Sequence, residues 1–283
     1  MEKKDKKVIL ITGTSSGFGF LLSKRLSTNK NFIVCATMRN MLKKDFLIQE
    51  VNKINGEIDV FELDVTKNNT IDLAIKNIVE KYKKIDILVN NAGIALGGFF
   101  EDIEEDEFRK VLDTNFFGQL CVIKKVLPFI PRKNKSKIIN ISSIAGLVSY
   151  PGLSAYNSSK YAIDGFTESL RYELYDLGIS VHLIEPGSFD TNIFLENLIL
   201  FKKYYNSNSK YNEKVKTMLD KIKKTKRENP TKVIDVIESI INEKNKNFRN
   251  IVGHSAKISF FLKKFLPFSI FERIVRFFSY KIN

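Results

Sequence analysis

Near its start the chain runs Val8-Ile9-Leu10-Ile11-Thr12-Gly13-Thr14-Ser15-Ser16-Gly17-Phe18-Gly19. The first four residues form a continuous apolar run, which is typical of a parallel strand covered on both faces. Glycine lets the backbone turn sharply and approach a phosphate, and a helix that begins near Gly17 would point free N–H groups and the positive end of its dipole at that phosphate. The stretch predicts a strand, a nucleotide-binding turn and a helix. Taken alone, it also fits a plain glycine-rich turn.

A second string, Tyr156-Asn157-Ser158-Ser159-Lys160, lies in a stretch with a helical pattern. Side chains four residues apart share one face of a helix, so the lysine would lie beside the tyrosine. A positive charge ~5 Å from a phenol, at an effective dielectric constant of ~20, favours the phenolate by about 3 kcal/mol before the cost of burial is subtracted. The tyrosine pKa would fall by roughly 2 units, toward the range useful for general acid and base catalysis.

Together the two strings resemble the short-chain dehydrogenase/reductase family, and the resemblance runs from about residue 6 to residue 255. Further motifs follow in the order of the family. They are Asn90-Asn91-Ala92-Gly93 after a strand at 85–89, Asn115 in a long helix, Ser143 after a strand at 138–141, and Pro186-Gly187 with Thr191 after a strand at 179–184. The resemblance implies an enzyme that transfers hydride between a nicotinamide cofactor and a carbonyl or alcohol.

The resemblance also implies roles for individual residues. Tyr156 would be the general acid and base, Ser143 would polarise the substrate oxygen, and Lys160 would also hold the nicotinamide ribose. Asn115 would keep a water chain to Lys160, or would simply satisfy backbone groups where its helix bends. Ser142 is the alternative to Ser143, although strand alternation points the two in opposite directions. The residues expected to contact the cofactor are Gly13, Ser15, Ser16, Gly17, Phe18, Gly19, Arg39, Asp64, Val65, Asn91, Ala92, Gly93, Tyr156, Lys160, Pro186, Gly187 and Thr191.

The end of the second expected strand bears on cofactor choice. Enzymes that prefer NAD usually carry an acidic residue about 20 residues beyond the glycine motif. Here that position corresponds to Met38, and Arg39 follows, whose planar guanidinium suits a 2′-phosphate. We therefore expect NADP (NADPH), with a solvated surface arginine as the alternative. The resemblance makes Asp64 a partner of the adenine amino group; alternatively, Asp64 caps the turn before Thr66.

Strand and helix patterns alternate along a chain of 283 residues, long enough for one sizeable domain. Strands are expected near 7–12, 31–37, 58–63, 85–89, 137–142, 179–184 and 248–252, and helices near 17–29, 41–54, 67–83, 104–129, 154–177 and 231–244. Such alternation predicts an α/β fold, a single Rossmann-like doubly wound parallel sheet of about seven strands with a C-terminal helical extension. Residues 1–255 would form the catalytic domain, with a substrate loop near 188–230, and 256–283 the extension.

The net charge is +14, but the basic residues are scattered. This pattern favours acidic ligands over nucleic acid, and we expect no nucleic-acid partner. Cys35 and Cys121 have neither metal-ligand nor disulfide-framework spacing, so we expect reduced thiols and no metal site. No apolar signal-peptide core precedes the first strand. These features favour a cytoplasmic protein.

The C-terminal extension carries two amphipathic stripes separated by Pro267. The first comprises Ile258, Phe261, Leu262 and Phe265, the second Ile270, Phe271, Ile274, Val275 and Phe278, with lysines and arginines interspersed. Interrupted by charge, the extension is too polar to span a bilayer. It would pack on the domain, cover the pocket or meet a second subunit; alternatively, it would bind peripherally to a membrane surface.

Such an extension, with the Ala36-Thr37-Met38-Arg39 string, resembles the hydroxysteroid and retinol dehydrogenase branch of the family. The resemblance implies a small hydrophobic carbonyl or alcohol substrate, and a homodimer through the helices near 104–129 and 154–177. Two other functions stay open: a 3-oxoacyl-thioester reductase that docks an acidic carrier, and a non-catalytic NADP-binding regulator.

Overall fold

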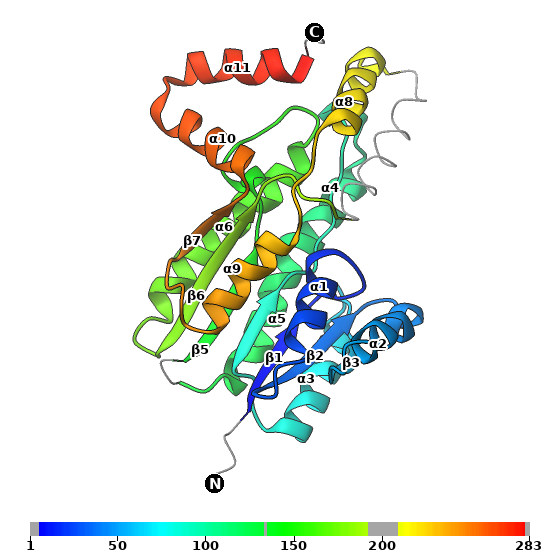
Figure 1. Cartoon of the computed structure of the whole chain (residues 1–283). Helices are drawn as coiled ribbons and strands as arrows, with labels where there is room; N and C mark the ends of the chain where they lie inside the picture. The colour runs from blue at the N-terminus through cyan, green and yellow to red at the C-terminus, as the bar shows by residue number, and fades with distance from the viewer. Residues whose placement is uncertain (1–5, 133–134, 192–208, 281–283) are drawn as a thin grey trace.

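The computed structural model of the protein describes residues 6–132, 135–191 and 209–280. Its centre is a parallel sheet of seven strands, as expected from the sequence, and the structure gives the strand order as β3-β2-β1-β4-β5-β6-β7 (Figure 1). The strands are β1 (Lys7–Ile11), β2 (Phe32–Met38), β3 (Asp59–Glu62), β4 (Ile87–Asn90), β5 (Ser136–Ile141), β6 (Ile179–Pro186) and β7 (Arg249–Val252).

Helices cover both faces of this sheet. One face packs against α3 (Asn68–Tyr82), α5 (Gly118–Val126) and α6 (Ser154–Glu173), and the other against α1 (Gly17–Leu26) and α9 (Thr231–Ile241). Successive β1 residues alternate between the two cores: Val8 and Leu10 belong to the first, Ile9 and Ile11 to the second. Because both faces are buried, the strand reads as one continuous apolar run.

The strand order reverses between β1 and β4, which is where doubly wound sheets bind their ligands, beyond the carboxyl ends of the strands. Ile9 pairs with Val34 of β2 on one side and with Ile87 of β4 on the other. The Thr12–Gly19 turn therefore lies between the ends of these two neighbouring strands.

The long helix expected at 104–129 is interrupted. It consists of α4 (Glu105–Leu112), a π-helical turn (Asp113–Phe117) and α5, followed by a 3₁₀ turn (Leu127–Phe129). The widened turn has a local cause, because Asn115 turns its side chain inward and hydrogen-bonds the backbone of Ile94.

The other helices of the described residues are α2 (Lys44–Asn52), which packs beside β2, α8 (Asn212–Lys224), α10 (His254–Phe265) and α11 (Phe268–Tyr280). Figure 1 shows α10 and α11 beyond the carboxyl ends of the strands, with α11 reaching toward α8. No helix in the described part of the chain is both long and apolar enough to cross a membrane. Of the expected substrate loop, residues 192–208 lie outside the described residues.

Candidate active site

The glycine-rich turn is fixed by contacts with the end of β4. Gly13 has φ +69°, and a Cβ there would lie 2.7 Å from Ala92 Cα. Asn91 Nδ2 donates to the carbonyl oxygens of Thr12 and Gly13, at 2.9 Å each. A Cβ on Gly19 would collide with the Gly13 carbonyl oxygen and the Asn91 amide, so glycine there lets α1 pack directly on the turn.

This turn presents an open helix N-terminus. Ser16 is the N-cap residue of α1, and its side chain makes no capping hydrogen bond. The first N–H groups of α1 are thus left for another acceptor, and the helix dipole favours an anion there. The turn fits the pyrophosphate of a dinucleotide.

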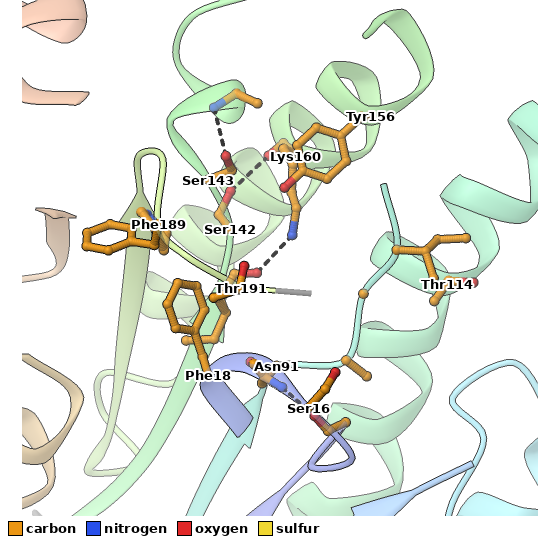
Figure 2. A pocket seen from close by; sticks show the side chains of 18 of the residues that line it. Ser16, Phe18, Asn91, Thr114, Ser142, Ser143, Tyr156, Lys160, Phe189 and Thr191 are labelled. Atoms are coloured by element: carbon orange, nitrogen blue, oxygen red, sulfur yellow. Dashed lines mark hydrogen bonds between the residues drawn. The ribbon is translucent and has the colours of Figure 1, made fainter. Parts of the chain in front are cut away.

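A cavity of about 630 Å³ runs from the turn to the first turns of α6 (Figure 2). It is lined by most of the residues that the sequence analysis assigned to the site. They are Gly13, Ser15, Ser16, Gly17, Phe18, Arg39, Asp64, Val65, Asn91, Ala92, Gly93, Ser143, Tyr156, Lys160, Pro186, Gly187 and Thr191. Among the expected residues, Gly19 and Asn115 do not line it.

At one end of the cavity, Arg39 is exposed and has no hydrogen bond or ion pair with another described residue. Lys43, four residues further on, lines the same wall and was not foreseen. Met38, in contrast, is 1% exposed and packs with Leu47 and Val51. Met38 therefore does not face the cavity, and the residue at this strand end that does is Arg39.

Asp64 lines the adjacent wall and also caps its own turn. Its Oδ1 accepts from Thr66 N at 3.0 Å and from Thr66 Oγ1 at 2.8 Å. The capping alternative is thus present in the structure, while the contact with adenine stays a prediction.

At the other end, Ser143, Tyr156 and Lys160 meet (Figure 2). Ser143 Oγ accepts from Ala145 N at 3.1 Å, and the Ser143 hydroxyl acts on the Tyr156 phenol by lowering its pKa. Lys160 Nζ donates to Ile141 O at 3.0 Å and lies 5.6 Å from the centre of the Tyr156 ring. An acid, a hydrogen-bonding hydroxyl and a cation therefore share one small volume.

Burial dominates the titration of this group. It raises the pKa of Tyr156, against the smaller lowering effect of Ser143, and it lowers the pKa of Lys160 to about 8. The sequence analysis expected Lys160 to lower the tyrosine pKa. The net direction for Tyr156 is opposite to the expected one, because burial of the phenol dominates its pKa.

The two neighbouring serines have different partners. Ser142 Oγ donates to the carboxylate of Asp164, whereas Ser143 Oγ faces Tyr156. This difference favours Ser143 as the residue that meets a substrate oxygen.

Asn115 is completely buried and fully hydrogen-bonded. Its Oδ1 accepts from Ile94 N at 2.8 Å, and its Nδ2 donates to Ile94 O at 2.8 Å and to Ser159 Oγ at 3.0 Å. These contacts match the alternative role, in which Asn115 satisfies backbone groups where its helix bends. A role in holding water for Lys160 stays a prediction.

Sequence reasoning missed the apolar half of the cavity. Its walls include Ile94, Ile144, Tyr150, Leu153 and Phe189, and three residues at the start of α10, Ser255, Ala256 and Ser259. Tyr150 and Ser259 both line the cavity, so the start of α10 adjoins the wall that holds the catalytic group. No spacing in the sequence indicates that residues so far apart meet. Lys43 did carry a signal, because it is a second cation four positions after Arg39.

Comparisons with known proteins identify relatives of this chain. Residues 7–198 match the family model described as short chain dehydrogenase. The chain is 39% identical over 277 residues to the uncharacterized oxidoreductase YusZ of Bacillus subtilis, covering 96% of this chain and 98% of that protein. It is 33% identical over 275 residues to the 3-ketodihydrosphingosine reductase of Bacteroides thetaiotaomicron, covering 96% and 97%. A solved short-chain dehydrogenase from Streptomyces avermitilis is 28% identical, with a TM-score of 0.77 and 96% of each chain covered.

Proposed function

The chain belongs to the short-chain dehydrogenase/reductase family of oxidoreductases, which act on CH–OH and C=O groups, and from this membership we propose that it reduces the carbonyl of an apolar substrate with NADPH. One observation carries the proposal. A single cavity joins the glycine-rich turn and Arg39 to the Ser143, Tyr156 and Lys160 group.

The cofactor would be held by groups already described. The N-terminus of α1 would bind the pyrophosphate, Lys160 would hold the nicotinamide ribose, and Arg39 with Lys43 would pair with the 2′-phosphate. When bound, the nicotinamide supplies the hydride that reduces the carbonyl. Exposed and without an ion-pair partner among the described residues, Arg39 gives NADP a binding contact that NAD lacks.

The protein's own residues then handle the oxygen and its proton. Ser143 orients the carbonyl oxygen by a hydrogen bond, and Tyr156 donates its proton as negative charge develops there. Because burial raises the pKa of Tyr156, the phenol is protonated near neutral pH and ready to act as an acid. Lys160, with a pKa of about 8, is mostly cationic at pH 7 and offsets the phenolate that forms.

An apolar, long-chain ketone suits the walls beside this group. Ile94, Ile144, Leu153 and Phe189 line them, and Phe189 meets Phe18 edge to face with ring centres 5.8 Å apart. The printed name of the relative in Bacteroides thetaiotaomicron, 3-ketodihydrosphingosine reductase, supports this substrate class.

A substrate panel tests the proposal. Purified protein and NADPH would be mixed with long-chain ketones, with 3-oxoacyl thioesters on an acidic carrier, and with no substrate, while the nicotinamide absorbance is followed. We expect NADPH to be oxidised when free long-chain ketones are present. Turnover on carrier-linked thioesters alone would indicate a thioester reductase, and cofactor binding without turnover would indicate a regulator.

We propose that residues 1–255 form the catalytic domain and that the 256–283 extension serves it. Ala256 and Ser259 of α10 line the cavity, while Phe261 and Phe265 on its other side are 55% and 69% exposed. Lys264 Nζ lies 5.6 Å from the centre of the Phe265 ring, and Arg273 and Arg276 of α11 are exposed. The exposed side would touch an anionic membrane surface peripherally, next to the cavity from which an apolar substrate is taken.

We further propose a cytoplasmic homodimer. Both cysteines are free, as is usual in a reducing compartment. Phe117 and Tyr172, on the helices expected to form the subunit contact, are 52% and 69% exposed, which supports an apolar interface there. Light scattering of the purified protein would give twice the chain mass if the proposal holds and the single chain mass if it does not.

A further inference from the structure

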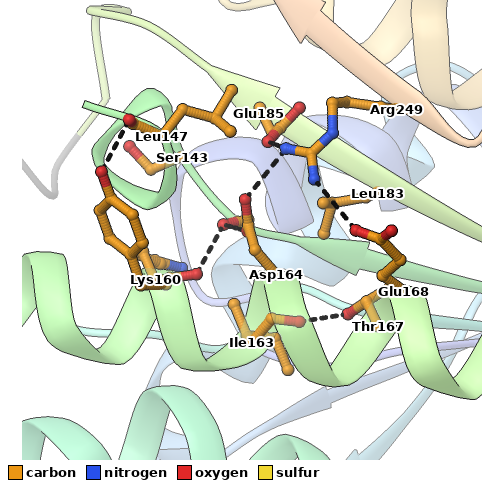
Figure 3. Close-up of polar contacts among 12 residues, drawn as sticks. Ser143, Leu147, Lys160, Ile163, Asp164, Thr167, Glu168, Leu183, Glu185 and Arg249 are labelled. Atoms are coloured by element: carbon orange, nitrogen blue, oxygen red, sulfur yellow. Dashed lines mark hydrogen bonds and ion pairs between the residues drawn. The ribbon is translucent and has the colours of Figure 1, made fainter.

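A cluster of buried charges lies directly behind the catalytic group. It consists of Asp164 on α6, Glu185 on β6 and Arg249 on β7, and the two carboxylates are 5% and 0% exposed (Figure 3). Arg249 Nη1 donates to Asp164 Oδ2 at 3.2 Å and to Glu185 Oε1. No step of the proposed reaction uses these residues, yet burying charge is costly unless the charges are well paired.

The cluster is joined to the active site by Ser142 and by α6 itself. Ser142 Oγ donates to Asp164 Oδ1 and lies 3.5 Å from the carbonyl oxygen of Lys160. Lys160 and Asp164 are four residues apart on α6, so their side chains share one face of the helix, and Lys160 is 4% exposed. Figure 3 shows Asp164 between Lys160 and Arg249.

The hydrogen bonds divide the charge unequally between the two carboxyl groups. Both Asp164 oxygens accept hydrogen bonds, from Ser142 and from Arg249. Glu185 Oε2 is buried without a hydrogen-bond partner among the described residues. Burial, and then the neighbouring Asp164, raise the pKa of Glu185. Two donors point at Asp164 and one at Glu185, so the arrangement suits a proton on Glu185.

We propose that Asp164 is a positioning residue for the active site: its carboxylate, fixed by Ser142 and Arg249, supplies the negative charge that keeps Lys160 an ammonium ion beside Tyr156. Glu185 holds a proton, so that one carboxylate is left to face both Lys160 and Arg249. The inference rests on the proposed role of Lys160 and adds a residue that acts through it.

The surrounding charges agree with this assignment. The charged groups around Asp164 are Lys160, one turn earlier on α6, Glu185 on β6 and Arg249 on β7. Glu168, one turn later on α6, lies 3.9 Å from Arg249 Nη2 and is half exposed. Burial lowers the pKa of Lys160, and Asp164 is the charge that opposes this fall. Without Asp164, Lys160 would lose its proton at lower pH.

A direct test is the titration of Lys160 itself. Protein labelled with [ε-¹³C]lysine would be titrated by NMR, and the Lys160 signal would be assigned by its loss in Lys160→Arg. In Asp164→Asn we expect the midpoint to fall by about one pH unit or more. In Asp164→Glu, which restores the charge, it should return toward the wild-type value. Glu168→Gln, which removes a rim charge from the same Arg249, is the matched control and should leave it in place.

Each outcome decides the matter. An unchanged midpoint in folded Asp164→Asn, or an equal fall in Glu168→Gln, would overturn the proposal. If Asp164→Asn does not fold, the Lys160 titration is measured in Glu185→Gln. There the Lys160 midpoint should match that of wild type. A lower Lys160 midpoint would show that Glu185, and not Asp164, carries the negative charge. The titration needs no turnover, so a confirmed shift in a protein that reduces no ketone would count against the proposed function alone.

Discussion

Lys160 Nζ lies 5.6 Å from the centre of the Tyr156 ring, and both side chains belong to the wall of one cavity. At this distance the ammonium stabilises a phenolate when one forms. Because burial nevertheless raises the pKa of the tyrosine, the pair favours the protonated phenol in the resting enzyme. The geometry suits an acid that gives up its proton only as charge develops on a substrate oxygen.

Replacing Tyr156 with Phe should remove that acid and keep the cofactor cradle. Turnover should fall at least ~100-fold, while the affinity for NADPH, measured by fluorescence titration, stays nearly unchanged. Tyr161→Phe is a matched control on the same helix, since that hydroxyl bonds Leu147 O and Lys263 and does not line the cavity. Near-normal turnover in Tyr156→Phe would mean that another group donates the proton.

Arg39 should set the preference for NADPH over NADH. Arg39→Ala should remove ~1.5 to 3 kcal/mol of that preference, the value of a charge-assisted contact. Arg39→Asp should go further and favour NADH, because a carboxylate at this cavity-facing position can accept from ribose hydroxyls. Dissociation constants for both cofactors would be measured, with Arg109→Ala, an exposed arginine outside the cavity, as control. Equal affinities in wild type would contradict the assignment.

Glu185→Gln should change how stability depends on pH. The folded-state pKa of Glu185 is raised above its ordinary value of 4.5, so wild type loses stability as pH rises from there toward the folded-state pKa. Glutamine mimics the protonated acid and does not titrate. The free energy of unfolding in urea should therefore rise in the variant relative to wild type as pH rises from 5 to 8. We expect this relative increase to be roughly 1 kcal/mol or more.

The control for this measurement is Glu173→Gln, an exposed position at the end of α6. It should show no such trend. If the free energies of unfolding of Glu185→Gln and wild type differ by the same amount from pH 5 to pH 8, Glu185 does not hold a proton in the folded protein.

The exposed rings of α10 should carry membrane contact. Phe261 and Phe265 stack with ring centres 5.9 Å apart. Full-length protein should sediment with anionic vesicles at low salt and be released as salt screens its cations. Phe261→Ser with Phe265→Ser should abolish this, whereas Leu73→Ser, an equally exposed site on α3, should not. If wild type stays in the supernatant at low salt, the extension serves only as a pocket wall or subunit contact.

Local sequence predicted the fold well because each signal is short in range. The apolar run of β1, the glycines that follow it and the four-residue spacing of Tyr156 and Lys160 each specify a local shape. Parallel strands then bring their carboxyl ends together, so motifs far apart in the chain fall around one cavity.

What the sequence could not supply depends on burial and on long-range contact. The side to which Met38 points, the desolvation of Tyr156 and the meeting of Asp164 with Arg249 follow from packing between distant elements. Asp164 did carry a signal, since it lies four residues after Lys160 on the same helix face. Its partners on β6 and β7 did not.

Deuteride transfer tests the central claim most directly. The purified protein would be mixed with NADPH deuterated at the transferring position of the nicotinamide and with a long-chain ketone, and the alcohol would be analysed by mass spectrometry. We predict one deuterium on the carbinol carbon of the product in wild type, and at least ~100-fold slower formation of that product in Tyr156→Phe. Tight NADPH binding with no deuterium in any alcohol across the ketone panel would contradict the account.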